Sequence, residues 1–126
     1  QIIQMAREAG AKNVYFCSAA PAVRFPNVYG IDMPSAHELI AHNRSTQDVA
    51  ELIGADWLVY QDLPDLIEAV GGGKIKIEHF DCAVFDGQYV TGDIDAAYLE
   101  KIEQARNDAS KVKNQAVSAI IDLYNN

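Results

Sequence analysis

Short apolar runs and amphipathic segments alternate along the first part of the chain. Residues 14–17 and 57–60 are apolar and rich in β-formers, which predicts two buried strands. Apolar residues spaced three or four apart predict helices at residues 1–9, 35–43, 45–53 and 62–70. This order of elements is typical of a parallel sheet with right-handed helical crossovers, an α/β fold.

Local signals mark where these helices begin and end. Residues 35–38 and 45–48 have the pattern of a capping box, in which a hydroxyl and a carboxylate satisfy free backbone N–H groups. Pro64 suits the first turn of the next helix. Glycines end two of the helices, at residue 54 and at residues 71–73, and the glycine run predicts a flexible joint.

The Asp86-Gly87 dipeptide lies between two runs of β-formers, residues 80–85 and 88–91. Because this dipeptide favours a type I′ turn, the pattern predicts a β-hairpin. A helix is expected from Asp93, with an inner face formed by Ile94, Ala97, Tyr98, Ile102 and Ala105. A weaker helical stripe continues beyond Asn107, through Val112, Ala116, Ile120 and Leu123.

The predicted sheet is incomplete. Two strands bury too little apolar surface to be stable alone in water. The first helix, residues 1–9, has no N-cap residue before it, so we expect the chain to be cut from a longer protein. Either upstream sequence supplies the rest of the sheet, or a second copy of the chain covers its edges.

Composition excludes several functions. The chain has 126 residues, with 10 Lys and Arg against 18 Asp and Glu, and its formal net charge is −8. Binding to nucleic acid or to an anionic membrane through bulk charge is therefore not expected. No apolar run approaches the roughly 20 residues of a membrane span. The two cysteines, Cys17 and Cys82, suit neither a disulfide framework nor a metal site, which favours a reducing cytoplasm.

The sequence contains no recognisable catalytic motif or metal-ligand spacing, so no catalytic residue and no metal site are predicted from pattern alone. The informative segment is the loop of residues 19–34, whose prolines exclude a helix and indicate an irregular loop ordered by its own side chains. It leaves the carboxyl end of the first predicted strand, where ligands bind in open α/β sheets. The alternative is that the loop only packs onto its own domain.

Several stretches of the sequence resemble one protein family. Residues 18–21, 24–35 and 82–91 are similar to the C-terminal part of amidophosphoribosyltransferases, and shorter matches lie at residues 38–41, 53–56 and 61–63. In one register the resemblance covers roughly residues 1–106. It implies the trailing part of a type I phosphoribosyltransferase-like parallel sheet at residues 1–70, a glycine joint and β-hairpin at 71–92, and a C-terminal helical region at 93–126.

The resemblance also implies a reaction, the first step of de novo purine nucleotide synthesis. Ammonia released from glutamine attacks the anomeric carbon of phosphoribosyl pyrophosphate, which gives 5-phosphoribosylamine, glutamate and pyrophosphate. The glutaminase domain and the acidic phosphoribosyl pyrophosphate motif of the family are not in this chain. We therefore expect the isolated chain to be inactive and the parent to be a cytoplasmic homo-oligomer.

Site residues follow from the same resemblance. Purine nucleotides inhibit the family at the phosphoribosyltransferase site, and Met33 and Pro34 match a segment near it. An apolar residue beside a rigid one can form a wall for a base. Ser18, at the end of the first predicted strand, is a further candidate.

The resemblance further implies that Mg²⁺ binds in the parent through the substrate's pyrophosphate. Some members hold an iron–sulfur cluster, with one cysteine where this chain has Asn27 and others near Cys82, so no cluster is expected here. Two other interpretations stay open: a non-catalytic α/β module that binds a nucleotide or a protein, and a structural domain without a ligand.

Overall fold

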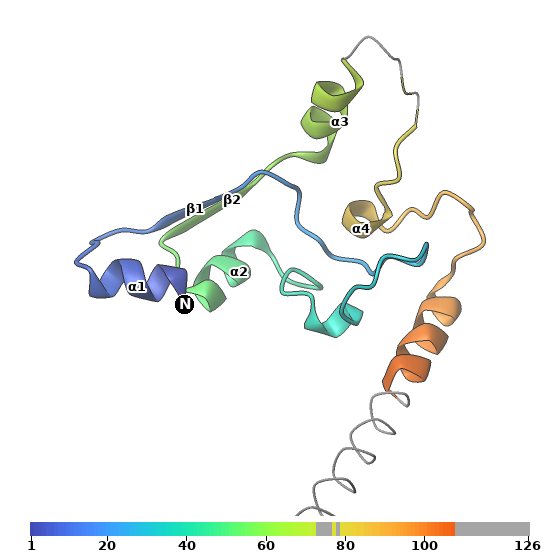
Figure 1. The fold of residues 1–126 in the computed structure, drawn as a ribbon, viewed down its shortest axis with the longest axis horizontal. Helices are drawn as coiled ribbons and strands as arrows, with labels where there is room; N and C mark the ends of the chain where they lie inside the picture. The colour runs from blue at the N-terminus through green and yellow to red at the C-terminus, as the bar shows by residue number, and fades with distance from the viewer. Residues whose placement is uncertain (73–76, 78, 108–126) are drawn as a thin grey trace, which may run out of the picture. The chain divides into compact units, whose positions relative to one another are not determined.

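The computed structural model describes residues 1–72, 77 and 79–107. Its elements, in chain order, are α1 (Ile2–Glu8), β1 (Tyr15–Ser18), the short 3₁₀ helix η1 (Ala36–Glu38), α2 (Thr46–Ile53), β2 (Trp57–Tyr60), α3 (Leu63–Gly71) and α4 (Ala83–Asp86), shown in Figure 1. Residues 96–107 are also helical. The chain forms two compact units, one from Gln1 to Val90 and a second that begins at Thr91.

Strands β1 and β2 pair in parallel, which confirms the predicted parallel arrangement. Tyr15 lies opposite Trp57 and Ser18 opposite Tyr60. Asp56 fixes this register from the amino end: its backbone N–H donates to the Val14 carbonyl at 2.9 Å, and its carboxylate accepts the Val14 N–H at 2.6 Å. The guanidinium of Arg7 donates to the same carboxylate at 2.9 Å, so α1 is tied to the start of both strands.

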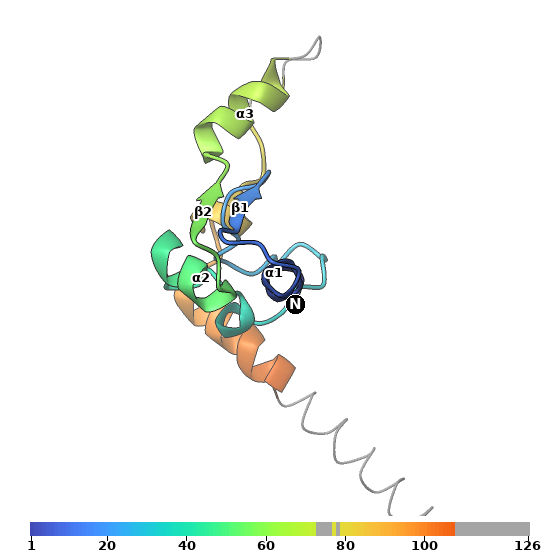
Figure 2. The same ribbon diagram turned by 90° about the vertical axis from the view of Figure 1, so that its left-hand side faces the viewer.

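The two faces of the sheet differ in burial. Helices α1 and α2 lie on one side of it in both views (Figures 1 and 2). Leu58 of β2 packs there against Val49 and Ala50 of α2, and all three are at most 5% exposed. Along each strand, successive side chains alternate between faces, so Tyr15, Cys17, Trp57 and Val59 share the opposite face.

That opposite face is open in this chain. Tyr15 is 63% exposed and Trp57 is 54% exposed, although their rings contact each other edge to face at 6.2 Å. The prediction of two buried strands is therefore wrong for these side chains. It is wrong for Phe16 as well, which is 44% exposed on the side of the helices, and of the two strands only Leu58 is buried. The physical reason is that helices cover only one face of the two-stranded sheet, and cover it incompletely at β1.

Helices α2 and α3 confirm two of the predicted segments. Ser45 caps α2: its hydroxyl oxygen accepts the Asp48 N–H at 3.1 Å, and the Asp48 carboxylate accepts the Ser45 N–H at 2.8 Å. Gly54 ends α2 with φ +75°, a conformation that favours glycine. Pro64 lies in the first turn of α3, and Gly72 caps its end.

The helix predicted through residue 43 is not formed. The capping box is present, with the Glu38 carboxylate accepting the Ser35 N–H at 3.0 Å, but Leu39 has extended backbone angles and ends η1 at Glu38. Arginine side chains bind carbonyls of the segment that follows: Arg44 donates to Ile40 O at 3.0 Å and Arg24 to Ala41 O at 2.7 Å. These contacts stabilise a series of turns instead.

The predicted β-hairpin is wrong. Residues 83–86 form α4, and the Asp81 carboxylate accepts the Ala83 N–H at its start at 3.1 Å. Gly87 has φ +75°, but it caps α4 with its N–H on the Ala83 carbonyl. A type I′ turn needs positive φ at both central residues, whereas Asp86 is helical. The dipeptide does provide the expected positive φ, at Gly87, but at a helix end and not in a hairpin turn.

In the second unit, the predicted helix is confirmed at residues 96–107, and the Asp95 carboxylate accepts the Tyr98 N–H at its start at 2.8 Å. Ile94 and Ile102 are half-buried, whereas Ala97, Tyr98 and Ala105, also expected on the inner face, are exposed. Gly73 of the predicted joint and the stripe at residues 112–123 lie outside the described residues. Within the described part, no helix is both long and apolar enough to cross a bilayer.

Candidate functional site

The carboxyl ends of β1 and β2 lie side by side. Ser18 pairs with Tyr60, and the Gln61 N–H donates to the Ser18 carbonyl at 3.1 Å, one residue past the strand. From this edge β1 continues into the loop of residues 19–34, while β2 continues into α3. The loop therefore leaves the edge of the sheet at which ligands of parallel α/β folds bind, as the sequence predicts.

Ser18 shapes the first turn of the loop. Its hydroxyl donates to the Ala20 carbonyl at 2.8 Å and accepts the Ala20 N–H at 3.3 Å. The side chain is half-buried. In this conformation the Ser18 hydroxyl is engaged in turning the chain away from β1.

Arg24 anchors the middle of the loop to the turn after η1. One guanidinium nitrogen donates to the carbonyls of Ala41 and Arg44, both at 2.7 Å. Nδ1 of His42 donates to the Arg24 carbonyl at 2.6 Å, and the His42 ring lies edge to face with Phe25 at 6.4 Å. The one cation of the loop is thus held by backbone carbonyls and serves the loop's own structure.

Residues 84–89 anchor the loop from its other side. The Val84 carbonyl accepts the N–H groups of Arg24 and Phe25 at 2.9 and 3.1 Å. Gly87 packs against the Phe25 ring so closely that a Cβ there would lie 3.0 Å from two ring carbons. We call Arg24, Phe25, His42, Gly87 and Tyr89 the loop clamp.

Tyr89 completes the loop clamp. It is 9% exposed, and its hydroxyl donates to the Pro26 carbonyl at 2.7 Å. Burial, then Tyr29 and Asp81, raise the pKa of Tyr89, so the hydroxyl keeps the proton that it donates. Its ring lies edge to face with Tyr29 at 6.2 Å.

Asn27 closes the turn that follows. Its side-chain oxygen accepts the N–H groups of Tyr29 and Ile31 at 2.9 and 3.1 Å. The expectation that the loop is ordered by its own side chains is therefore correct for Asn27, and Ser18 adds hydrogen bonds from the end of β1. The loop clamp is an addition, because its partners come from residues 41–44 and 84–89.

Met33 and Pro34 lie between the Asn27 turn and the capping box of η1. Met33 is half-buried and Pro34 is exposed, while Ser35 directly after them is 9% exposed. Pro34 thus presents its ring to solvent beside a fixed backbone. The structure holds the segment at both ends, at Asn27 and at Ser35.

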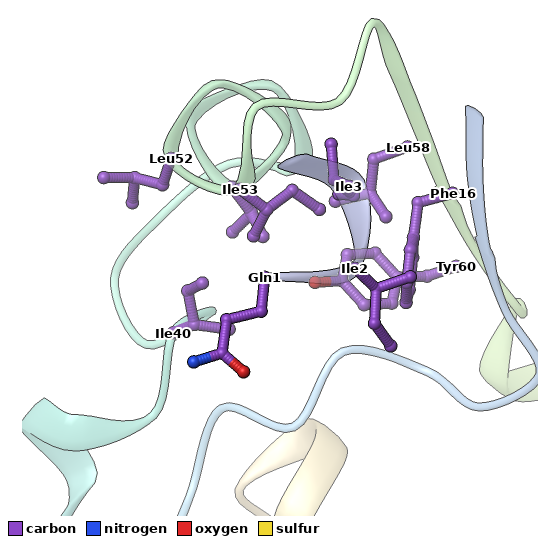
Figure 3. Close-up of a pocket in the computed structure, with 10 residues that line it drawn as sticks. Gln1, Ile2, Ile3, Phe16, Ile40, Leu52, Ile53, Leu58 and Tyr60 are labelled. Carbon is purple, nitrogen blue, oxygen red and sulfur yellow. The ribbon is translucent and has the colours of Figure 1, made fainter. Parts of the chain in front are cut away.

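An apolar hollow of about 630 Å³ lies between the sheet and its two helices (Figure 3). Ile40 and Leu52 lie on one side of it, and Phe16 and Tyr60 lie on the other. None of its described lining residues is cationic, whereas phosphates are bound by N–H donors and cations. The chemistry of this hollow fits apolar side chains.

A second hollow, of about 450 Å³, lies beside α4 and is lined by His79, Phe80, Cys82, Asp86, Gln88, Tyr89 and Val90. Burial, then Asp86 and Asp81, raise the pKa of the Cys82 thiol. Cys82 is thereby kept in the unreactive thiol form. Among their described lining residues, neither hollow includes Ser18, Met33 or Pro34.

In the described part of the chain, no three His, Cys, Asp or Glu side chains gather so that they could hold a metal ion. The two cysteines lie in different elements, Cys17 on β1 and Cys82 before α4, and both are free thiols. The described residues therefore present no ready metal or cluster site.

No family model matches the chain. Over 99% of its length, however, it is 88% identical to the amidophosphoribosyltransferase of Pseudomonas aeruginosa. It is 54% identical to that of Haemophilus influenzae and 55% identical to that of Escherichia coli, again over 99% of its length. The chain belongs to the amidophosphoribosyltransferase family. It spans about a quarter of the length of these curated relatives, 25% in each case.

Within this amidophosphoribosyltransferase segment, sequence reasoning missed the loop clamp. Tyr89 and Pro26 are 63 residues apart, and no local pattern relates them. The sequence does indicate a positive φ at Gly87. It does not indicate that the Phe25 ring packs against this glycine.

Proposed function

We propose that this chain is the C-terminal part of the phosphoribosyltransferase half of a cytoplasmic, homo-oligomeric amidophosphoribosyltransferase. The parent would be a transferase of purine synthesis that makes 5-phosphoribosylamine from phosphoribosyl pyrophosphate and glutamine. The observation that carries the proposal is the 88% identity over 99% of the chain, at 25% of the length of the Pseudomonas aeruginosa relative.

The open face of the sheet supports the proposal. Tyr15 and Trp57 are 63% and 54% exposed, and in register with each other they form a continuous apolar surface with Cys17 and Val59. Large exposed apolar patches are typical of surfaces that another polypeptide covers. The remaining three quarters of the relatives' length is long enough to supply that cover.

We propose further that Met33 and Pro34 line the nucleotide side of the site. The loop that carries them leaves the carboxyl edge of the sheet, and the turn at Asn27 and the box at Ser35 hold the segment between them. A wall that is already ordered loses little conformational entropy when a base docks against it. Ser18 contributes less directly, because its hydroxyl bonds to Ala20.

Cofactors enter this proposal only through the parent enzyme. Mg²⁺ would arrive with the pyrophosphate of the substrate, since the described residues gather no metal-binding set. An iron–sulfur cluster does not fit the chain: it needs about four cysteines, whereas this sequence has Cys17 and Cys82. Asn27, where cluster-bearing relatives place a cysteine, accepts two backbone N–H groups instead.

A chimeric enzyme tests the proposal. The matching quarter of the Pseudomonas aeruginosa amidophosphoribosyltransferase is replaced by this chain, and the same host protein without that quarter is the control. We expect the chimeric enzyme to convert phosphoribosyl pyrophosphate and glutamine at a rate close to that of the host, and the truncated host to be inactive. A chimeric enzyme that folds but makes no phosphoribosylamine would refute the proposal.

The isolated chain separates the other interpretations. We expect it to catalyse neither glutamine hydrolysis nor phosphoribosylamine formation, and to show no saturable binding of adenosine or guanosine monophosphate at millimolar concentration. Saturable binding by the isolated chain would favour a self-contained nucleotide-binding module. In the chimeric enzyme, Met33→Ala should weaken inhibition by the same nucleotides.

A further inference from the structure

Tyr89 holds the loop at two points. Its hydroxyl donates to the Pro26 carbonyl at 2.7 Å, and its ring lies against Tyr29 at 6.2 Å. The side chain is 9% exposed. One buried side chain therefore fixes both the backbone before the Asn27 turn and a side chain within it.

The backbone around this contact has little freedom. Arg24 and Phe25 are bound on one side by the Val84 carbonyl and on the other by the Arg24 contacts with the turn after η1. The next residues are closed by Asn27, which accepts N–H groups as far along as Ile31. Movement of Pro26 would therefore be passed along the turn toward Met33.

The other end of the segment is also fixed. Ser35 is 9% exposed, and its N–H donates to the Glu38 carboxylate at 3.0 Å. Met33 and Pro34 thus connect two anchors. Tyr89 is the distant residue whose side chain reaches the first of them directly, at Pro26 and Tyr29.

We propose that Tyr89 is a positioning residue for the nucleotide side of the site: by holding Pro26 and Tyr29, it sets where Met33 and Pro34 stand. The inference rests on the proposed function for the role of Met33 and Pro34. It adds a residue that makes no contact with the ligand and acts through the loop. It also gives α4 and the residues after it a role, because these residues include Tyr89 and Gly87, and Gly87 packs against the Phe25 ring.

The experiment compares two forms of the chimeric enzyme, one with Tyr89→Phe and one with the unsubstituted chain. The substitution keeps the ring and removes the hydroxyl. We expect the inhibition constant of adenosine or guanosine monophosphate to rise about twofold to tenfold, the range that one intramolecular hydrogen bond carries. The rate of glutamine hydrolysis should stay unchanged, the rise in the inhibition constant should exceed any change in kcat, and amide exchange at Tyr29 and Ile31 should become faster.

Tyr98→Phe is the matched control, because it removes the same hydroxyl from a side chain that is 43% exposed. It should change none of these quantities. A loss that is only structural would lower kcat and thermal stability together, without a selective change in nucleotide inhibition. That result, or an unchanged inhibition constant in Tyr89→Phe, would overturn the inference.

Met33→Ala distinguishes the inference from the proposed function. If Met33→Ala weakens nucleotide inhibition and Tyr89→Phe does not, the positioning role is wrong and the nucleotide-side assignment stands. If Met33→Ala has no effect while Tyr89→Phe speeds exchange at Tyr29 and Ile31, the nucleotide-side assignment is wrong, and the positioning role fails with it. Parallel weakening in both variants supports both.

Discussion

Gly87 combines two constraints that a single substitution can separate. Its φ is +75°, and a Cβ added there would lie 3.0 Å from Cε1 and Cζ of Phe25 and 3.2 Å from Cε2. Gly54 has the same φ of +75° but nothing within 4 Å of its added Cβ. Gly54→Ala therefore measures the backbone strain alone, and Gly87→Ala measures the strain together with the ring contact.

The magnitudes follow from these distances. An alanine in the left-handed region costs about 1 kcal/mol at either position. Overpacking against the Phe25 ring adds about 1 to 3 kcal/mol at Gly87 alone. We therefore expect Gly87→Ala to destabilise the contact between the loop and α4 by about 1 to 3 kcal/mol more than Gly54→Ala destabilises the end of α2.

Hydrogen exchange of individual amides is the suitable assay, because a multidomain enzyme does not unfold in one step. In the chimeric enzyme, the amides of Arg24 and Phe25 report on the contact, since both donate to the Val84 carbonyl. Strain and overpacking together cost about 2 to 4 kcal/mol at Gly87, so their exchange should accelerate roughly 30-fold to 700-fold in Gly87→Ala, at about 1.4 kcal/mol per tenfold change. They should be unaffected by Gly54→Ala.

A double-mutant cycle shows whether the ring is the cause. Phe25→Leu removes the ring atoms that face Gly87, so in that background Gly87→Ala should cost only the backbone strain, about 1 kcal/mol. Two results would refute the reasoning: equal effects of Gly87→Ala on Arg24 exchange with Phe25 and with Leu at that position, or no acceleration at all.

Three further outcomes are expected in the chimeric enzyme. Val49→Ala, at a side chain that is 2% exposed, should lower the opening free energy read by amide exchange in α2 and β2 by about 2 kcal/mol. Val70→Ala, at 54% exposed, should change it by less than about 0.5 kcal/mol, and equal changes would contradict the core around Val49. The Val14 N–H, followed by Arg7, holds the pKa of Asp56 below its ordinary value of 3.8, so its contribution to stability is fully present above that pH and is lost as the pH falls through the lower folded pKa. Asp56→Asn should flatten the fall in melting temperature below pH 3.8, and an unchanged slope would exclude the carboxylate as its source. Cys17, exposed on the open face of the sheet, should be alkylated by iodoacetamide in the isolated chain and protected in the chimeric enzyme, as read by mass spectrometry of its peptide; equal labelling would show that nothing covers that face.

Sequence patterns predicted the parts of the fold that short-range physics determines. Ser45 and Gly54 mark the ends of α2 because capping and positive φ are properties of a few adjacent residues. The run at residues 57–60 became β2 with the same bounds, since a short β-rich run between helices has few alternatives. The parallel pairing followed from the order of the elements.

The errors share a cause, which is contact between residues distant in sequence. The Asp86-Gly87 dipeptide fits a hairpin turn and a helix end equally well, and contact with Phe25 and the N–H groups on Val84 accompanies the helix end. The helix predicted through residue 43 ends at Glu38, where Leu39 is extended, and Arg24 from the loop binds carbonyls of the turns that follow. Burial of the strands was overestimated because an apolar run shows that a face needs cover, and not which polypeptide provides it.

The candidate site was predicted in outline. The loop leaves the carboxyl edge of the sheet as expected, but the assigned roles of Ser18, Met33 and Pro34 came from family resemblance and stay predictions. The loop clamp could not be predicted, because a hydrogen bond between a tyrosine and a carbonyl 63 residues away has no signature in the sequence.

The most direct test of the central claim uses ammonia in place of glutamine as the nitrogen source. Ammonia bypasses the glutaminase, so formation of 5-phosphoribosylamine from ammonia and phosphoribosyl pyrophosphate reports on the phosphoribosyltransferase half alone. We expect the chimeric enzyme to carry out this ammonia-dependent reaction and the host protein without the matching quarter not to do so, even where it still hydrolyses glutamine. Equal ammonia-dependent rates with and without this chain would contradict the claim that it forms part of the phosphoribosyltransferase site.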